Sequence, residues 1–275
     1  MALTLQSPVQ LSSGYPMPAL GLGVYQNGDC FPACLAALQH GYRHIDSARR
    51  YGNEAEVGRA VRESGVPRSE VFITSKVFHT EHGYKSTLEA VDSSLERFGT
   101  DYIDLYLIHD PCSGKQMRLD TWRALIEAQK AGKLRTIGVS NYGVKHLEEI
   151  REAGLATPSV NQIELHPFCQ QKEIVAYCNA RGIAIQAYSP LVRGRFDDPV
   201  LQDVAKKYNK TVAQVLARWS LQRGFCPLPK SAQPARVVSN TDLYDFEMSP
   251  EDIARIDALD QGKDGALKWN PVDAE

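Results

Sequence analysis

Residues 71–109 read VFITSKVFHTEHGYKSTLEAVDSSLERFGTDYIDLYLIH. The stretch holds two short apolar runs, Val71–Lys76 and Ile103–His109. Between them lies Lys85–Phe98, in which apolar residues recur at the spacing of one helix face. Gly99 follows directly, and glycine readily adopts the left-handed conformation that ends many helices. The pattern predicts a strand, a helix and a second strand, which is the unit that builds parallel sheets.

The same alternation continues along most of the chain. Six further strands are predicted at Leu20–Val24, His44–Ala48, Leu134–Asn141, Ser159–Pro167, Ile183–Pro190 and Phe225–Ser231. Five further helices are predicted at Glu54–Glu63 (with Asn53 as N-cap), Leu119–Ala131, Lys145–Ala153, Lys172–Ala180 and Val212–Gln222. Ahead of them, Val9–Leu11 and Met17–Leu20 predict a β-hairpin.

Eight repeated βα units can close into a barrel. We therefore expect an α/β fold, a (β/α)8 TIM barrel with an N-terminal β-hairpin and extra C-terminal helices. An open doubly wound sheet is the alternative that the order of elements leaves open. Because no linker or shift in composition divides the chain, residues 1–275 are interpreted as a single domain.

Charge and composition exclude several classes of partner. The formal net charge of −2 and the isoelectric point of about 6.4 predict no general attraction to nucleic acid or to an anionic membrane. No apolar run approaches the ~20 residues that a membrane-spanning helix needs. The N-terminal residues lack a secretion pattern, so the six cysteines are expected to be free thiols in a cytoplasmic protein. A monomer is expected, since no apolar stripe or heptad repeat is seen.

Polar residues stand at or just beyond the ends of three successive predicted strands. Asp46 and Lys76 belong to the first two and His109 ends the third, while Tyr51 lies just past the first. In a βα barrel these strand ends share one rim, where active sites form. Lys76 is the natural partner of a buried Asp46, and its ammonium is expected to lower the pKa of Tyr51. The four residues predict a proton relay.

Two other readings of these residues stay open. The Asp–Lys pair is an ordinary buried ion pair in many barrels. A metal site is the second reading, with His44, Asp46, His109 and His166 as ligands. An ammonium at Lys76 competes with a metal ion beside Asp46, so no metal is expected.

At this point the sequence resembles the aldo-keto reductase superfamily. The resemblance covers most of the chain in the family's order, and most resembles the compact microbial branch that includes 2,5-diketo-gluconate reductases and prostaglandin F synthase-like enzymes. It rests on His44-Ile45-Asp46, Tyr51-Gly52-Asn53-Glu54, Ser75-Lys76, Leu107-Ile108-His109, Gly138-Val139-Ser140-Asn141, residues 161–167 (NQIELHP), Ala187-Tyr188-Ser189-Pro190-Leu191 and Pro229-Lys230-Ser231.

The resemblance implies a nicotinamide cofactor bound without a Rossmann fold. In agreement, Gly21-Leu22-Gly23 lacks the third glycine of the dinucleotide fingerprint. By position, Tyr51 is the general acid, Lys76 and Asp46 tune it, and His109 orients the substrate carbonyl.

The resemblance also implies a set of cofactor contacts. Besides Asp46, the residues are Ser140, Asn141 and Gln162 at the carboxamide, Tyr188 against the ring, Ser189, Pro190 and Leu191 along the pyrophosphate, and Lys230, Ser231, Arg236 and Asn240 at the adenosine end. Two cations and a hydroxyl suit a 2′-phosphate, so NADPH is the expected cofactor, with NADH as the less preferred alternative. Ser239 stands where the family usually has Glu, which predicts looser binding of adenine or a relaxed cofactor specificity.

The matching pocket residues are Tyr25, Phe78, His109 and Asp110, with Trp269 in the C-terminal tail. Asp110 stands where the family usually has Trp. We expect it to raise the pKa of His109 or to admit a polar substrate, and the alternative is a solvated loop carboxylate.

The sequence therefore predicts an NADPH-dependent oxidoreductase that reduces the carbonyl of a small aldehyde or ketone. A cofactor-sensing regulatory or binding protein with little turnover is the alternative on the same barrel. A lyase or metal-dependent hydrolase is a third reading.

Overall fold

The computed structural model describes residues 3–267 and 269–275. Within them, eight strands form one parallel sheet in the order β3-β4-β5-β6-β7-β8-β9-β10, and two form an antiparallel hairpin. The strands are β1 (Pro8–Gln10), β2 (Pro16–Pro18), β3 (Leu22–Gly23), β4 (His44–Asp46), β5 (Phe72–Val77), β6 (Ile103–Ile108), β7 (Leu134–Ser140), β8 (Val160–Glu164), β9 (Ala184–Tyr188) and β10 (Cys226–Pro227).

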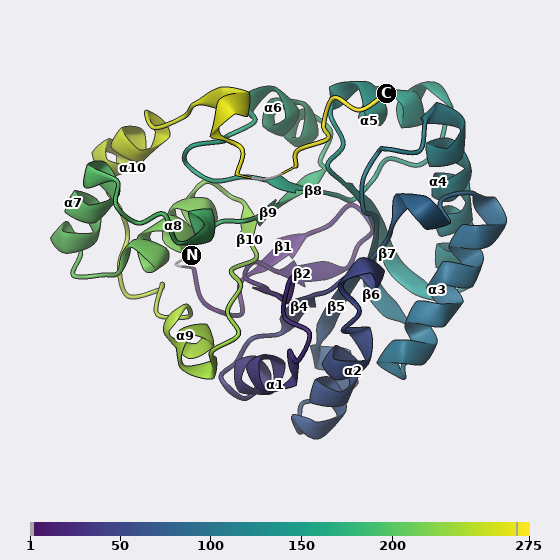
Figure 1. Ribbon diagram of the computed structural model, residues 1–275, viewed down its shortest axis with the longest axis horizontal. Helices are drawn as coiled ribbons and strands as arrows, with labels where there is room; N and C mark the ends of the chain where they lie inside the picture. The colour runs from purple at the N-terminus through teal and green to yellow at the C-terminus, as the bar shows by residue number, and fades with distance from the viewer. Residues whose placement is uncertain (1–2, 268) are drawn as a thin grey trace.

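The first and last strands of the sheet meet, which closes it into a barrel (Figure 1). Gly23 pairs in parallel with Lys230, and the Gly23 N–H donates to the Pro229 carbonyl at 3.0 Å. A Cβ on Gly23 would lie 3.0 Å from the carbonyl oxygen of Leu228, so glycine permits the close approach at this seam. The predicted barrel is confirmed, and the open sheet is excluded.

Helices surround the barrel (Figure 1). In the described residues they are α1 (Phe31–Gln39), α2 (Glu54–Glu63), α3 (Tyr84–Phe98), α4 (Lys115–Lys130), α5 (Val144–Glu152), α6 (Lys172–Ala180), α7 (Pro199–Lys207), α8 (Val212–Gln222), α9 (Pro234–Ser239) and α10 (Pro250–Asp257). Gly99 ends α3 with φ +65°, as its position predicted. Asn53 precedes α2 as expected, but its side chain makes no capping bond and instead donates to the carbonyls of Val24 and Asn27.

The N-terminal hairpin covers one end of the barrel. Val9 in β1 lies opposite Met17 in β2. Ser12 and Ser13 anchor the turn of the hairpin. Ser12 Oγ donates to the hydroxyl of Ser159, the residue before β8, at 3.0 Å. Ser13 Oγ lies 2.8 Å from the hydroxyl of Thr136, near the start of β7. The hairpin therefore blocks the end where the strands begin and leaves the opposite end for chemistry.

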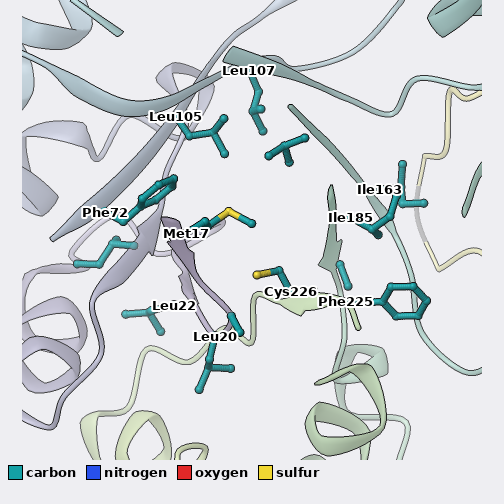
Figure 2. Packing of buried hydrophobic residues seen from close by; sticks show 14 of the residues in the cluster. Met17, Leu20, Leu22, Phe72, Leu105, Leu107, Ile163, Ile185, Phe225 and Cys226 are labelled. Carbon is teal, nitrogen blue, oxygen red and sulfur yellow. The ribbon is translucent and has the colours of Figure 1, made fainter. Parts of the chain in front are cut away.

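Apolar side chains fill the barrel interior. Figure 2 shows Met17 from the hairpin reaching in among side chains such as Leu105 of β6 and Cys226 of β10. These three side chains are fully buried or nearly so. The Met17 sulfur also lies 3.2 Å from Nε2 of Gln186 in β9. The hairpin thus acts as a plug that completes the core.

Seven of the eight barrel strands are shorter than predicted, among them β3, β8 and β10. The predicted strand at Phe225–Ser231 is regular only at Cys226–Pro227, because Pro227 and Pro229 have no N–H to donate to a ladder. The predicted Leu20–Val24 is regular only over the two residues of β3, and Ser159–Pro167 only over the five of β8.

Candidate active site

The polar residues at the carboxyl ends of β4, β5 and β6 come together as predicted. Asp46 is the last residue of β4, Lys76 the second last of β5, and His109 follows β6. Neighbouring register places Asp46 beside Thr74 and Lys76 beside Leu107, so the three strand ends form one rim.

Asp46 and Lys76 form a buried ion pair. Lys76 Nζ donates to Asp46 Oδ1 at 2.7 Å and to the Ser47 carbonyl at 2.8 Å. The Lys76 side chain is fully buried, and this burial lowers its pKa, while the Asp46 carboxylate acts in the opposite direction. Asp46 therefore orients the Lys76 side chain and opposes the loss of its proton.

Tyr51 completes the predicted group. It ends a 3-10 turn, Arg49–Tyr51, directly after β4, and its ring is half-buried. Lys76 Nζ donates to the Tyr51 hydroxyl oxygen at 3.4 Å. The expectation that Lys76 lowers the pKa of Tyr51 is wrong for this structure, because burial, followed by the negative charge of Asp46, raises that pKa well above its ordinary value. The phenol therefore keeps its proton at neutral pH.

His109 lies against two aromatic rings. Its ring centre is 5.7 Å from that of Tyr51 and 5.5 Å from that of Phe78, both edge-to-face. Burial and the Lys76 charge lower the pKa of His109 well below its ordinary value. The ring is therefore neutral near pH 7. Its Nδ1 atom is buried and forms no hydrogen bond within the described residues.

The second oxygen of Asp46 accepts from the amide of Gln162 in β8, and that amide also contacts Gln186 in β9. Gln162 Nε2 donates to Asp46 Oδ2 and to Gln186 Oε1, both at 2.8 Å. Gln162 was expected at the cofactor carboxamide, but its amide nitrogen is already hydrogen-bonded to Asp46. Gln186 was missed by the sequence reasoning, although a lone amide in the buried run Ile185-Gln186-Ala187 is itself a signal.

Asn141 joins three strand ends. It has φ +60°, and its Nδ2 donates to the His109 carbonyl at 3.0 Å while its Oδ1 accepts from the Tyr188 hydroxyl at 2.8 Å. Ser140 Oγ donates to the Gln162 carbonyl at 2.9 Å. The structure thus brings together the residues predicted at the carboxamide, and it fixes Tyr188 through its hydroxyl.

The residues predicted at the phosphates follow β9 and β10. Ser189 has φ +52°, Pro190 is buried and Leu191 is half-buried. Beyond β10, Lys230 and Arg236 are exposed and form no ion pair with any residue of the described ranges.

Ser231 and Asn240 lie with these cations but are buried. Ser231 Oγ accepts from the Gln233 N–H at 3.0 Å, which orients the turn into α9. Ser239, at the position that departs from the family pattern, is exposed. Two free cations on this side are well suited to an anion.

The pocket residues separate into two groups. The Tyr25 ring packs on Tyr51 at 5.0 Å while remaining 48% exposed, and Phe78 lines His109. Trp269 is 53% exposed, so closure of the pocket by this tail is not seen.

Two expectations for Asp110 are wrong, namely a solvated loop carboxylate and a raised pKa of His109, whereas its role in admitting a polar substrate stays a prediction. Its side chain is fully buried, so it is no solvated loop carboxylate. Its two oxygens lie 2.9 and 3.0 Å from His79 Nδ1, and Oδ1 also accepts the Cys112 N–H at 3.0 Å. The pKa of the preceding His109 is lowered rather than raised. Sequence reasoning missed His79 because only the fold brings the β5 and β6 loops together.

Two features of the structure bear on the alternatives. In the part of the chain that the structure describes, no three His, Cys, Asp or Glu side chains are placed to hold a metal ion. Over the same residues, no helix has the length and apolar character to cross a membrane.

Comparison with known proteins gives a consistent result. Residues 19–261 match the model of the Aldo/keto reductase family. The chain is 48% identical to "Glyoxal reductase" of Bacillus subtilis (strain 168), with 98% of each chain covered. Among solved structures, MGS-M4, an aldo-keto reductase from a deep-sea metagenome library, superposes with a TM-score of 0.93 at 40% identity, covering 98% of this chain and 100% of that one. An aldo/keto reductase from Brucella melitensis gives a TM-score of 0.90 at 44% identity, covering 94% and 100%.

Proposed function

The chain belongs to the aldo/keto reductase family, and from this premise we propose that it reduces small aldehydes and ketones to alcohols with NADPH, using Tyr51 as the proton donor. Membership makes the chain an oxidoreductase, and the family uses nicotinamide cofactors in general. The observation that carries the finer proposal is the Asp46–Lys76–Tyr51 chain beside a neutral His109.

The residues at the strand ends fit a nicotinamide cofactor. Asn141 and Ser140 present polar groups beside the half-buried ring of Tyr188. On the adenosine side, Lys230 and Arg236 are exposed cations. A dianionic 2′-phosphate satisfies such a pair better than a ribose hydroxyl does, which supports NADPH over NADH.

When bound, NADPH supplies a hydride to the carbonyl carbon. The protein's part is to handle the charge that develops on the carbonyl oxygen. Neutral His109 acts as a hydrogen-bond partner that orients this oxygen, because its low pKa prevents it from carrying the proton.

Tyr51 then gives its proton to the oxygen. An alkoxide is a much stronger base than a phenolate, so the transfer is favourable even though burial raises the pKa of Tyr51. The phenolate that remains lies within 3.4 Å of the Lys76 ammonium, which Asp46 keeps charged. Lys76 thus stabilises the tyrosine after it has given up the proton.

The decisive assay follows NADPH absorbance with 4-nitrobenzaldehyde, with NADH and EDTA in parallel reactions. We expect turnover that NADPH supports better than NADH and that EDTA leaves unchanged. Tight NADPH binding without turnover on any carbonyl would identify the cofactor-sensing alternative. Activity that is lost with EDTA and needs no NADPH would identify a metal-dependent enzyme.

A further inference from the structure

A second group of charges lies beside the reaction centre, on the side of Phe78. Arg50 precedes Tyr51, and its guanidinium carbon is 5.4 Å from the centre of the Phe78 ring. The side chain is exposed, and Arg50 forms no ion pair within the described ranges. Its neighbour Arg49, by contrast, is paired with Glu81. Among the described residues, Arg50 is therefore an exposed cation without a partner, next to Phe78 and Tyr51.

His79 lies on the same ring of Phe78. The two ring centres are 3.9 Å apart, and the His79 side chain is 32% exposed. Its Nδ1 is held by the buried Asp110, so the ring has one orientation and Nε2 is left for other partners. Nε2 forms no hydrogen bond with a described residue.

Asp110 contacts the imidazole of His79 directly. Both of its oxygens face His79, and the nearby backbone N–H of Cys112 takes the remaining contact. The buried Asp110 carboxylate occupies one side of the His79 ring. The exposed side of that ring is therefore the side on which a second anion can be bound. Phe78 thus has a free guanidinium and an oriented imidazole beside it, and its edge faces His109.

From this geometry we propose that Arg50 and His79 recognise a carboxylate on the substrate, so that the preferred substrates are small aldehydes or ketones carrying a carboxylate a few bonds from the carbonyl. Arg50 and His79 are specificity residues in this account, and Asp110 is a positioning residue that acts through His79. The proposal rests on the carbonyl reduction proposed above. Burial and Lys76 are the largest causes of the lowered pKa of His109, and His79 and Arg50 make smaller contributions in the same direction, which agrees with their closeness to His109.

The test compares two aldehydes of nearly equal shape, 4-carboxybenzaldehyde and 4-carbamoylbenzaldehyde. The readout is the ratio of their kcat/KM values. In the unmodified protein the charged aldehyde is expected to be preferred about tenfold. Arg50→Gln and His79→Gln should each lower this ratio about five- to tenfold, as expected for a lost charge-assisted contact to a carboxylate. Asp110→Asn should lower it in the same direction.

Lys85→Gln is the matched control. Lys85 is 90% exposed on α3, and its loss removes one positive charge without touching the pocket. Its ratio should equal that of the unmodified protein. A ratio near one in the unmodified protein, or one that Arg50→Gln leaves unchanged, overturns the proposal. A general loss of stability moves both substrates together and leaves the ratio intact.

A binding measurement separates this proposal from the proposed function. The probe is 4-carbamoylbenzoate, an anion that is not reduced, titrated into the NADP+-loaded protein by calorimetry. Arg50→Gln is expected to weaken its binding at least fivefold, whereas Lys85→Gln should not. If no aldehyde is turned over but this difference holds, carbonyl reduction fails and the anion site stands. If aldehydes are reduced and the difference is absent, the anion site fails alone.

Discussion

Lys76 Nζ lies 2.7 Å from Asp46 Oδ1, and both side chains are almost completely buried. The ammonium donates its other bonds to the Ser47 carbonyl and the Tyr51 hydroxyl. One cation therefore connects the barrel interior with the phenol at the rim. Lys76 therefore has two roles: it neutralises the buried Asp46 carboxylate, and it contacts the hydroxyl of Tyr51. Substitution affects stability through the first role and activity through the second.

Breaking the Asp46–Lys76 pair should destabilise the fold more than removing both charges. Lys76→Met leaves Asp46 buried without its cation, and such losses cost about 3–5 kcal/mol. The double variant Asp46→Asn/Lys76→Met carries no buried charge at this place and should unfold at a higher urea concentration than Lys76→Met alone. Urea unfolding of the two single variants and the double variant measures the coupling. Additive losses would show that the pair is not a unit.

Protein stability should fall on acidification because of His44. This side chain is fully buried, and burial lowers its pKa to about 4. In the unfolded chain the pKa returns to about 6.5, so the unfolded state binds the proton first. The contribution of His44 is therefore complete above pH 6.5 and is lost between pH 6.5 and 4, by about 3 kcal/mol.

The check is the free energy of unfolding at pH 7 and pH 4.5, for the unmodified protein and for His44→Gln. The variant should lose less stability between the two pH values, since the other buried histidines remain in both proteins. An equal loss would assign the acid sensitivity to groups other than His44.

The cofactor preference should depend on Lys230 and Arg236. Replacing either with Met should raise the Kd for NADPH about tenfold, since each removes a charge-assisted contact to the 2′-phosphate. The Kd for NADH should change little. Lys130→Met is the control, because Lys130 is exposed at the end of α4, among residues that have no predicted cofactor role. Equal effects on both cofactors would place these two cations elsewhere than at the 2′-phosphate.

Much of the fold could be predicted because local signals agreed with one another. Six of the eight strand-like runs were followed by an amphipathic segment that glycine ended, as at Gly99. Helix α1 escaped prediction because Phe31–Gln39 is apolar on most sides and lacks a polar face to reveal its period. The ends of β10 were misjudged because apolar composition does not reveal which N–H groups are missing at Pro227 and Pro229.

In the candidate site, residues at strand ends could be predicted from the sequence, whereas contacts between loops could not. Asp46, Lys76 and His109 could be placed on one rim because consecutive parallel strands end together. Contacts between loops could not be derived in this way. The pairing of Asp110 with His79 and the contact of Gln186 with Gln162 depend on loop paths and on side-chain directions. The raised pKa of Tyr51 was missed for a related reason, since the depth of burial is a property of the whole fold.

Tyr51 as the proton donor is the central claim, and substitution by phenylalanine tests it most directly. The measurement is kcat for NADPH-dependent reduction of 4-nitrobenzaldehyde, with Tyr25→Phe as the control because the Tyr25 ring packs 5.0 Å from that of Tyr51. The account predicts that Tyr51→Phe loses at least about 10²-fold in kcat, as expected for a general acid, while NADPH binding and urea stability stay near those of the unmodified protein. It also predicts that Tyr25→Phe keeps most of its kcat. A Tyr51→Phe protein that turns over as fast as the Tyr25→Phe protein would contradict the account.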